Sequence, residues 1–262
     1  FPEKPDTKIG EEVLRVENLG RGRAVKGANL SIRAGEIVGL GGLVGSGRTE
    51  IARMIFGADP KETGEVYLNG EVLKLSSPAD AVHAGISLLP EDRKGEGIVL
   101  DFPIRVNSTM AGMGKVANSF GFIRRRKESR DVTELTDQLT LKCGHISDAV
   151  STLSGGNQQK VVLAKWMYAG GDLIIFDEPT RGVDVGAKTE IYGLIYKMAE
   201  EGKAVLVISS EHQELFGICD RVLVMGNGEL QGALLPSDYS EENLLHLAMA
   251  FGAAENIGDD DE

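Results

Sequence analysis

Residues 152–184 read TLSGGNQQKVVLAKWMYAGGDLIIFDEPTRGVD, a stretch in which one expected helix joins two polar segments. The first segment places a serine hydroxyl and two glycines directly before the helical run. The first backbone N–H groups of a helix have no partner within it, and glycines let a ligand approach them closely. This pattern predicts a phosphate-binding surface. Its expected residues are Ser154, Gly155, Gly156, Asn157 and Gln158.

The second polar segment follows an expected strand. Gly170 and Gly171 end the helix, and the apolar run Leu173–Phe176 is typical of a strand that is buried on both faces. Asp177 and Glu178 come directly after it, at the end of the strand where open α/β sheets bind ligands. The Asp177 carboxylate suits Mg²⁺, bound directly or through water, and the Glu178 carboxylate suits the activation of an attacking water.

A glycine-rich loop lies upstream. The expected strand Glu36–Leu40 leads into GLVGSGRT at residues 42–49, and a helix is expected to follow as far as Phe56. This loop fits the phosphate-cradling pattern G-x-x-x-x-G-K-[ST], with Arg48 in place of the lysine and the Thr49 hydroxyl kept for Mg²⁺. A purely structural glycine-rich turn is the alternative. The residues expected to hold phosphates are Gly42, Gly45, Ser46, Gly47, Arg48, Thr49 and Glu50.

Composition excludes several classes of protein. The chain has 262 residues, enough for one sizeable core, and its 42% hydrophobic and 26% charged residues are ordinary for a soluble globular domain. No apolar run approaches the roughly 20 residues that a membrane span needs. The net charge of −12 argues against a nucleic-acid partner. The start at Phe1 instead of Met suggests a fragment or a processed chain.

These motifs, in this order and spacing, resemble those of a known family. LSGGNQQ followed by LIIFDEPTRGVD is similar to the signature motif, Walker B motif and D-loop of ATP-binding cassette (ABC) transporter ATPases. The resemblance covers about Val13 to Ala250. It implies an α/β P-loop NTPase fold with a RecA-like core, an antiparallel β subdomain and an inserted α-helical subdomain. It also implies ATP and Mg²⁺ as ligands.

A narrower resemblance concerns the tandem ATPases of monosaccharide importers, of the ribose/galactose/xylose type. GLVGSGRTE, PEDRK, LSGGNQQK, DEPTRGVDVGAK and ISSE resemble the second nucleotide-binding domain of these proteins. The implied partners are an N-terminal cassette of the same polypeptide, transmembrane permease subunits and, indirectly, an extracytoplasmic sugar-binding protein. The implied location is peripheral, at the cytoplasmic face of the plasma (inner) membrane. The expected divisions are a linker at 1–11, a cassette at 12–250 with its helical subdomain at about 95–167, and an acidic tail at 251–262.

Three positions depart from the hydrolytic pattern of the family. Arg48 replaces the P-loop lysine, Glu91 stands in place of the Q-loop glutamine, and Ser210 takes the position of the switch histidine. The family's adenine-stacking aromatic residue is also missing from the first turn. Glu178 retains the position of the catalytic base, and His212 is not expected to replace the switch histidine. We therefore expect a site that binds nucleotide and hydrolyses it weakly.

Two other functions fit parts of the sequence. A non-hydrolysing structural or regulatory cassette is compatible with Arg48 and with the missing adenine-stacking residue. A non-transport ABC ATPase of DNA repair or chromosome maintenance is expected to have coiled-coil insertions or basic faces. The continuous sequence and the net charge of −12 disfavour that alternative.

Overall fold

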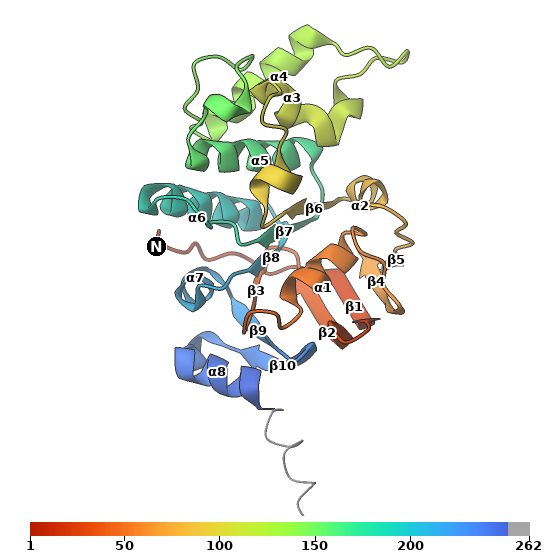
Figure 1. The fold of residues 1–262 in the computed structure, drawn as a ribbon, viewed down its shortest axis with the longest axis vertical. Helices are drawn as coiled ribbons and strands as arrows, with labels where there is room; N and C mark the ends of the chain where they lie inside the picture. Colours follow the sequence, from red (N-terminus) through yellow and green to blue (C-terminus); the bar gives the residue numbers. More distant parts are fainter. Residues whose placement is uncertain (251–262) are drawn as a thin grey trace, which may run out of the picture.

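The computed structural model describes residues 1–250 and arranges them as two β-sheets with surrounding helices (Figure 1). A helical part is inserted between two strands of the larger sheet, so the architecture is the predicted α/β class with its two additional parts. The acidic tail predicted at 251–262 lies outside the described residues. Within residues 1–250, every helix is too short or too polar to traverse a lipid bilayer.

The larger sheet contains six strands in the order β10-β9-β3-β8-β7-β6. The strands from β6 to β3 and β9 pair in parallel, while β10 is antiparallel to β9. Because β7, β8 and β3 are adjacent and parallel, the loops at their carboxyl ends meet at one edge of the sheet. The strands are β3 (Ile37–Gly42), β6 (Ile86–Leu89), β7 (Leu173–Asp177), β8 (Ala204–Ile208), β9 (Arg221–Gly226) and β10 (Glu229–Leu234).

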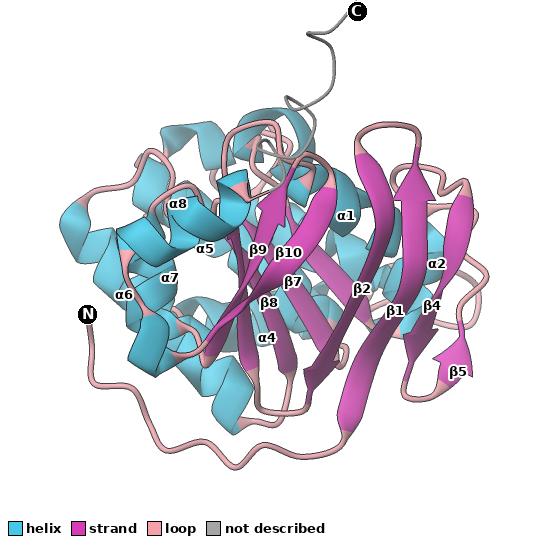
Figure 2. Cartoon of the chain, turned by 90° about the horizontal axis from the view of Figure 1, so that it is seen from below, coloured by secondary structure: helices cyan, strands magenta, loops and turns pink. Residues whose placement is uncertain are grey.

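The smaller sheet is antiparallel, in the order β2-β1-β4-β5, and lies beside the larger one (Figure 2). Its strands are β1 (Glu12–Arg21), β2 (Val25–Arg33), β4 (Thr63–Leu68) and β5 (Glu71–Val72). Asn69 and Gly70 both have positive φ, 51° and 81°, which is the geometry of a tight hairpin turn. Asn69 and Gly70 thus form the hairpin turn between β4 and β5, as expected of an Asn-Gly pair. The turn between β1 and β2 comprises residues 22–24.

The helices around the sheets are α1 (Arg48–Ile55), α2 (Pro78–Ala84), α6 (Val185–Glu200), α7 (His212–Ile218) and α8 (Glu241–Met249), with a 3₁₀ turn at Pro236–Asp238. The α6 helix begins at Val185, six residues before its first buried apolar side chain, Ile191. The reason is a cap, because the Asp184 Oδ1 accepts the Ala187 N–H at 3.0 Å. The α7 helix was not predicted, since its seven residues are too few to show a clear period.

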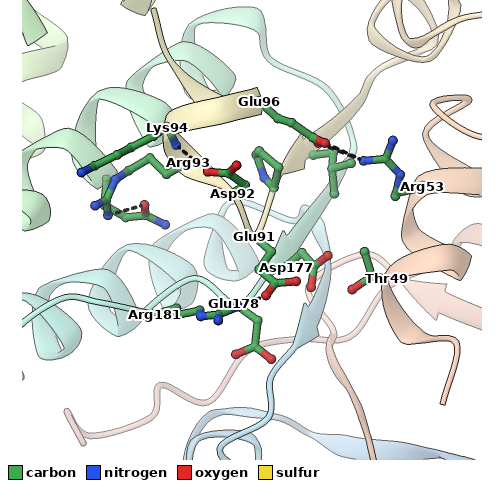
Figure 3. A pocket seen from close by; sticks show the side chains of 13 residues that line it. Thr49, Arg53, Glu91, Asp92, Arg93, Lys94, Glu96, Asp177, Glu178 and Arg181 are labelled. Atoms are coloured by element: carbon green, nitrogen blue, oxygen red, sulfur yellow. Dashed lines mark hydrogen bonds and ion pairs between the residues drawn. The ribbon is translucent and has the colours of Figure 1, made fainter. Parts of the chain in front are cut away.

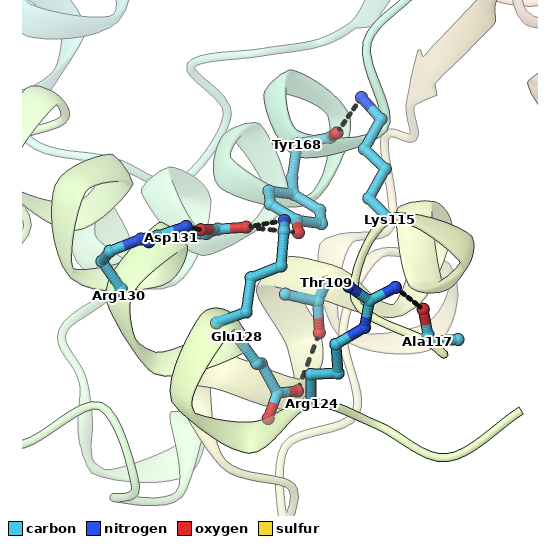
Figure 4. Close-up of polar contacts among 9 residues, drawn as sticks. Thr109, Lys115, Ala117, Arg124, Glu128, Arg130, Asp131 and Tyr168 are labelled. Carbon is cyan, nitrogen blue, oxygen red and sulfur yellow. Dashed lines mark hydrogen bonds and ion pairs between the residues drawn. The ribbon is translucent and has the colours of Figure 1, made fainter. Parts of the chain in front are cut away.

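The helical lobe, residues 93–169, separates β6 from β7 and lies at one end of the molecule (Figure 1). It consists of a π-helix (Arg93–Gly97), α3 (Ile104–Thr109), two 3₁₀ helices (Met110–Lys115 and Val150–Thr152), α4 (Arg125–Gln138) and α5 (Gly155–Ala169). Polar contacts join its helices (Figure 4): the Tyr168 hydroxyl donates to Asp131 at 2.9 Å, and the buried Glu128 accepts the Thr109 hydroxyl at 3.1 Å. The basic residues Arg125, Arg126 and Lys127 form the first turn of α4, and Arg124 is its N-cap.

The turn between α5 and β7 provides a stability prediction. Gly171 has a φ of +127°, and a Cβ there would lie 2.3 Å from the carbonyl oxygen of Gly85. We expect Gly171→Ala to lower the free energy of unfolding by about 3 kcal/mol, as measured by urea unfolding. Gly202→Ala is the matched control, because Gly202 also has a positive φ, +85°, but its Cβ would meet no atom within 4 Å. In this variant, backbone strain alone should lower the free energy of unfolding by about 1 kcal/mol. Equal losses in the two variants would contradict the predicted clash.

Candidate functional site

The loop between β3 and α1 requires glycine at two of the predicted positions. A Cβ at Gly42 would lie 2.3 Å from the Met225 carbonyl oxygen, and one at Gly47 would lie 2.3 Å from the Ala24 carbonyl oxygen. Both residues also have positive φ, 142° and 104°. The loop lines a cavity of about 530 Å³. All of the predicted loop residues except Gly42 line this cavity: Gly45, Ser46, Gly47, Arg48, Thr49 and Glu50.

The Arg48 side chain is held inside the protein. It is 8% exposed, and its Nη1 donates to the carbonyl oxygen of Ser209 at 2.8 Å, at the end of β8. Burial lowers the pKa of the guanidinium, and the nearby carboxylates of Asp177 and Glu178 oppose this effect. Arg48 thus supplies positive charge close to the loop while its guanidinium is bound to the main chain.

Asp177 and Thr49 form the part of the site that suits a cation. Asp177 ends β7, is 2% exposed, and its Oδ1 has no hydrogen-bond partner within the described residues. Burial raises the pKa of Asp177 to about 6, and a hydrogen bond from the Thr49 side chain partly offsets this rise. Residues 1–250 contain no cluster of three His, Cys, Asp or Glu that could hold a metal by itself. A carboxylate oxygen without a partner beside a hydroxyl fits Mg²⁺ that is also bound by ligand oxygens and water.

Glu178 follows Asp177 in a strained backbone conformation, with a φ of +50°. Both of its carboxylate oxygens are occupied: Oε1 accepts the Ser210 N–H at 2.7 Å, and Oε2 accepts the Ser210 hydroxyl at 3.1 Å. Burial raises the pKa of Glu178, while these two hydrogen bonds oppose the rise. The carboxylate is therefore placed at the site, but in this arrangement it is engaged by Ser210.

Glu91 lies close to these residues, as its position in the sequence predicts. It follows β6 and forms an ion pair with Arg181 (Figure 3). Glu91 and Arg181 line a second cavity, of about 540 Å³, together with Thr49, Asp177 and Glu178. Arg181 was not predicted as a site residue; its position four residues after Asp177 was the available signal.

The second group of predicted residues surrounds the start of α5. Ser154 caps this helix, and its Oγ accepts the Asn157 Nδ2 at 3.0 Å, as well as the Asn157 N–H at 3.5 Å. Ser154 is exposed, Gly155 and Asn157 are half-buried, and Gly156 and Gln158 are buried. A Cβ at Gly156 would lie 2.9 Å from the Ala187 Cβ, so this glycine allows α5 to approach α6. The helix start is thus capped and open to solvent.

The structure brings the predicted residues together as two separate groups. None of the five residues at the start of α5 lines either of the two cavities beside the glycine-rich loop. Gln159, one residue further on, connects the groups indirectly: its Nε2 donates to the Pro179 carbonyl oxygen at 2.8 Å, and its Oε1 accepts from Arg93 at 3.2 Å. Sequence reasoning missed Gln159 and Arg93. The His212 Nδ1 lies 3.6 Å from Glu241 Oε1, and His212 lines neither cavity.

Comparison with known families shows that residues 25–181, more than half of the chain, match the family described as ABC transporter. Solved structures share the fold. The ADP conformation of MJ1267, an ATP-binding cassette of an ABC transporter, has a TM-score of 0.73 at 21% identity and covers 94% of this chain and 98% of its own. Dimeric MJ0796 bound to ADP and Pi has a TM-score of 0.72 at 22% identity, with 85% and 98% covered. At these identities the likeness shows the fold alone.

Several curated relatives are much closer in sequence. The ribose import ATP-binding protein RbsA 3 of Rhizobium meliloti (strain 1021) is 64% identical over 259 residues, which is 98% of this chain and 51% of the relative. The ribose import ATP-binding protein RbsA of Chelativorans sp. (strain BNC1) is 53% identical over 250 residues, which is 95% of this chain and 49% of the relative. The chain thus spans about half the length of the curated relatives that it matches.

Proposed function

Because this chain belongs to the ABC transporter family of ATPases, we propose that it is the second, C-terminal cassette of a tandem ATP-binding protein that drives the import of a monosaccharide. Two findings support this proposal. The similar proteins from Rhizobium and Chelativorans carry the name of ribose import ATP-binding proteins, and the chain spans about half of their length. Ribose is therefore the first sugar to test. In this proposal the other half of the protein is an N-terminal cassette.

In this proposal the chain contributes half of each of two nucleotide sites. Its own glycine-rich loop, Thr49 and Asp177 hold one ATP. The start of α5 covers the ATP of the N-terminal cassette, where its free N–H groups present about half a positive charge to the γ-phosphate. The separation of the two groups on one chain supports this arrangement, since neither cavity beside the loop reaches Ser154.

The chain's own site binds nucleotide but hydrolyses it slowly. The observation that carries this conclusion is the engagement of both charged groups: Arg48 is bound to the Ser209 carbonyl, and both oxygens of Glu178 are bound by Ser210. Each of these hydrogen bonds occupies an oxygen that would have to accept a proton from water, and each opposes the rise that burial causes in the pKa of Glu178. Mg²⁺, when bound with ATP, supplies charge neutralisation at the phosphates, and the Thr49 hydroxyl and the Asp177 carboxylate would hold it.

The proposed assembly lies at the cytoplasmic face of the plasma (inner) membrane. The helical lobe contacts the permease subunits, which receive sugar from the extracytoplasmic binding protein, and residues 1–11 link the chain to the preceding cassette. ATP-driven closure of the two cassettes moves the permease subunits, and hydrolysis reopens them. Nucleic acid is not a partner in this proposal, in keeping with the net charge of −12.

Two measurements on this chain test the proposal: equilibrium binding of ATP with and without Mg²⁺, and steady-state ATP hydrolysis. We expect binding that Mg²⁺ strengthens, with a turnover at least about 10²-fold below that of the complete importer. Equal turnover would contradict the slow site. An absence of binding would instead favour the second candidate, a structural or regulatory cassette, which the engagement of Glu178 by Ser210 also fits.

The proposed role of Thr49 leads to a prediction about Mg²⁺. Thr49→Val keeps the shape of the side chain and removes the hydroxyl, so we expect the gain in ATP affinity from Mg²⁺ to fall by about 10-fold. Thr49→Ser is the matched control and should keep the gain. Titrations with ATP in the presence of Mg²⁺ or of a chelator measure it. An unchanged gain in Thr49→Val would show that the hydroxyl does not bind the ion.

A further inference from the structure

A buried carboxylate next to the site lines neither of the two cavities. Glu214, in the first turn of α7, is 2% exposed. Its Oε1 accepts the Thr180 hydroxyl at 2.9 Å, and its Oε2 accepts the hydroxyl of Ser209. Thr180 follows β7 and Ser209 follows β8, and these strands are neighbours in the sheet. Glu214 therefore joins the two loops that follow the central strands.

Ser209 and its neighbour Ser210 are hydrogen-bonded to both charged groups of the site, Arg48 and Glu178. The Ser209 carbonyl accepts Arg48, and the next residue, Ser210, donates two hydrogen bonds to Glu178. The Ser209 hydroxyl also accepts the Glu211 N–H at 3.0 Å, which fixes the turn between β8 and α7. This turn thus forms hydrogen bonds with both Arg48 and Glu178.

Thr180 belongs to the loop that bears Glu178, and this loop also contacts α5. Thr180 is 2% exposed and lies two residues after Glu178. The carbonyl of the residue between them, Pro179, accepts the Gln159 side chain of α5 at 2.8 Å. Glu214 is thus hydrogen-bonded to the loop that bears Glu178 and to the turn that bears Ser210.

The surroundings of Glu214 favour a positioning role. Burial raises the pKa of Glu214, and hydrogen bonds from the Ser209, Thr180 and Tyr192 side chains partly offset this rise. A buried carboxylate of this kind needs hydrogen bonds from its hydroxyl donors to offset the cost of its desolvation. These hydrogen bonds fix the positions of both the carboxylate and the hydroxyl groups. Removal of Glu214 would leave the Ser209 and Thr180 hydroxyls without their acceptor.

We propose that Glu214 is a positioning residue of the nucleotide site, which holds the Ser209–Ser210 turn against the loop that carries Glu178. In this way it sets the place of Arg48 and Glu178 without touching the nucleotide. The inference rests on the proposed function in one respect, which is that ATP is the ligand of the site. Glutamine at this position keeps one oxygen acceptor, and its amide can donate to the other hydroxyl, whereas alanine removes both contacts.

The test compares three variants of the full chain. We expect Glu214→Ala to weaken ATP affinity by at least about 10-fold, and Glu214→Gln to stay within about 3-fold of the unaltered protein. The Ser210 amide, which donates to Glu178, should exchange its hydrogen at least about 10-fold faster in Glu214→Ala, relative to the Val207 amide of β8. The control is Glu36→Ala: Glu36 is 6% exposed and is paired with Arg221 at 2.7 Å, at the opposite end of β3.

The control should lower the melting temperature but leave the ATP affinity and the relative exchange of Ser210 unchanged. If Glu214→Ala behaves in the same way as Glu36→Ala on both measurements, Glu214 has only a structural role and the proposal is wrong. If the unaltered chain does not bind ATP, the proposed function fails. The exchange comparison does not need nucleotide, so it still decides whether Glu214 holds the turn.

Discussion

Ser154→Arg is expected to abolish ATP-driven closure of the two cassettes and to reduce sugar uptake by the complete importer by at least about 10²-fold. Ser154 is exposed at the start of α5, where Gly155 and the free N–H groups are proposed to meet a γ-phosphate. An arginine side chain there would hold the neighbouring cassette away from these groups. Uptake of labelled sugar and ATP-dependent association of the cassettes measure the effect.

Ser240→Arg is the matched control for this change. Ser240 caps α8 in the same way, with its Oγ accepting the Asn243 N–H at 3.1 Å, but it is not part of the proposed site. Both variants lose a helix cap, which costs about 1 kcal/mol of stability. We expect uptake to survive in Ser240→Arg. Normal uptake in Ser154→Arg would contradict the role of α5.

The second large effect is a gain of activity. We expect the triple variant Arg48→Lys, Glu91→Gln and Ser210→His to raise the ATP turnover of this chain's own site by about 10²-fold. A lysine presents a compact ammonium to the phosphates, which the planar guanidinium of Arg48 does not. Replacing Ser210 also removes its hydroxyl from Glu178. The turnover is measured in the complete protein, with the site of the other cassette inactivated.

Glu178→Gln in the background of the triple variant is the control for this gain. If Glu178 is the base, the added change should cancel the increase, since a glutamine cannot accept the proton of an attacking water. Arg48→Lys alone should give a smaller gain, because Ser210 still occupies Glu178. A triple variant that hydrolyses ATP no faster than the unaltered chain would show that these three departures do not limit the rate.

Local signals in the sequence predicted most of the fold. The Asn69-Gly70 turn, the cap at Ser77 and the end of α5 at Gly170 all lie where their residue types predict. The buried strand Leu173–Phe176 was evident because both of its faces pack against other elements. The short α7 was not predicted, since a helix of two turns leaves little periodicity to detect.

The contacts of the site could be predicted only in part. The glycine-rich loop and the two carboxylates carry local motifs, and the structure brings them together. The hydrogen bond between Ser210 and Glu178 joins residues that are 32 positions apart in the sequence. The hydrogen bond between Arg48 and Ser209 joins residues that are 161 positions apart. Such contacts follow from the strand order β3-β8-β7, which no local pattern states. The buried Glu214 gave no signal for the same reason.

A cysteine cross-link in the complete two-cassette protein tests most directly whether the start of α5 serves the nucleotide of the other cassette. Ser154→Cys would be combined with a cysteine in the glycine-rich loop of the other cassette, with Cys143 replaced by Ser. A second protein would pair Ser154→Cys with Val44→Cys, which is exposed in this chain's own loop. We predict that ATP promotes the cross-link between the two cassettes. We predict no cross-link within this chain, with or without ATP. A cross-link within the chain, or no effect of ATP on the first pair, would contradict the composite site.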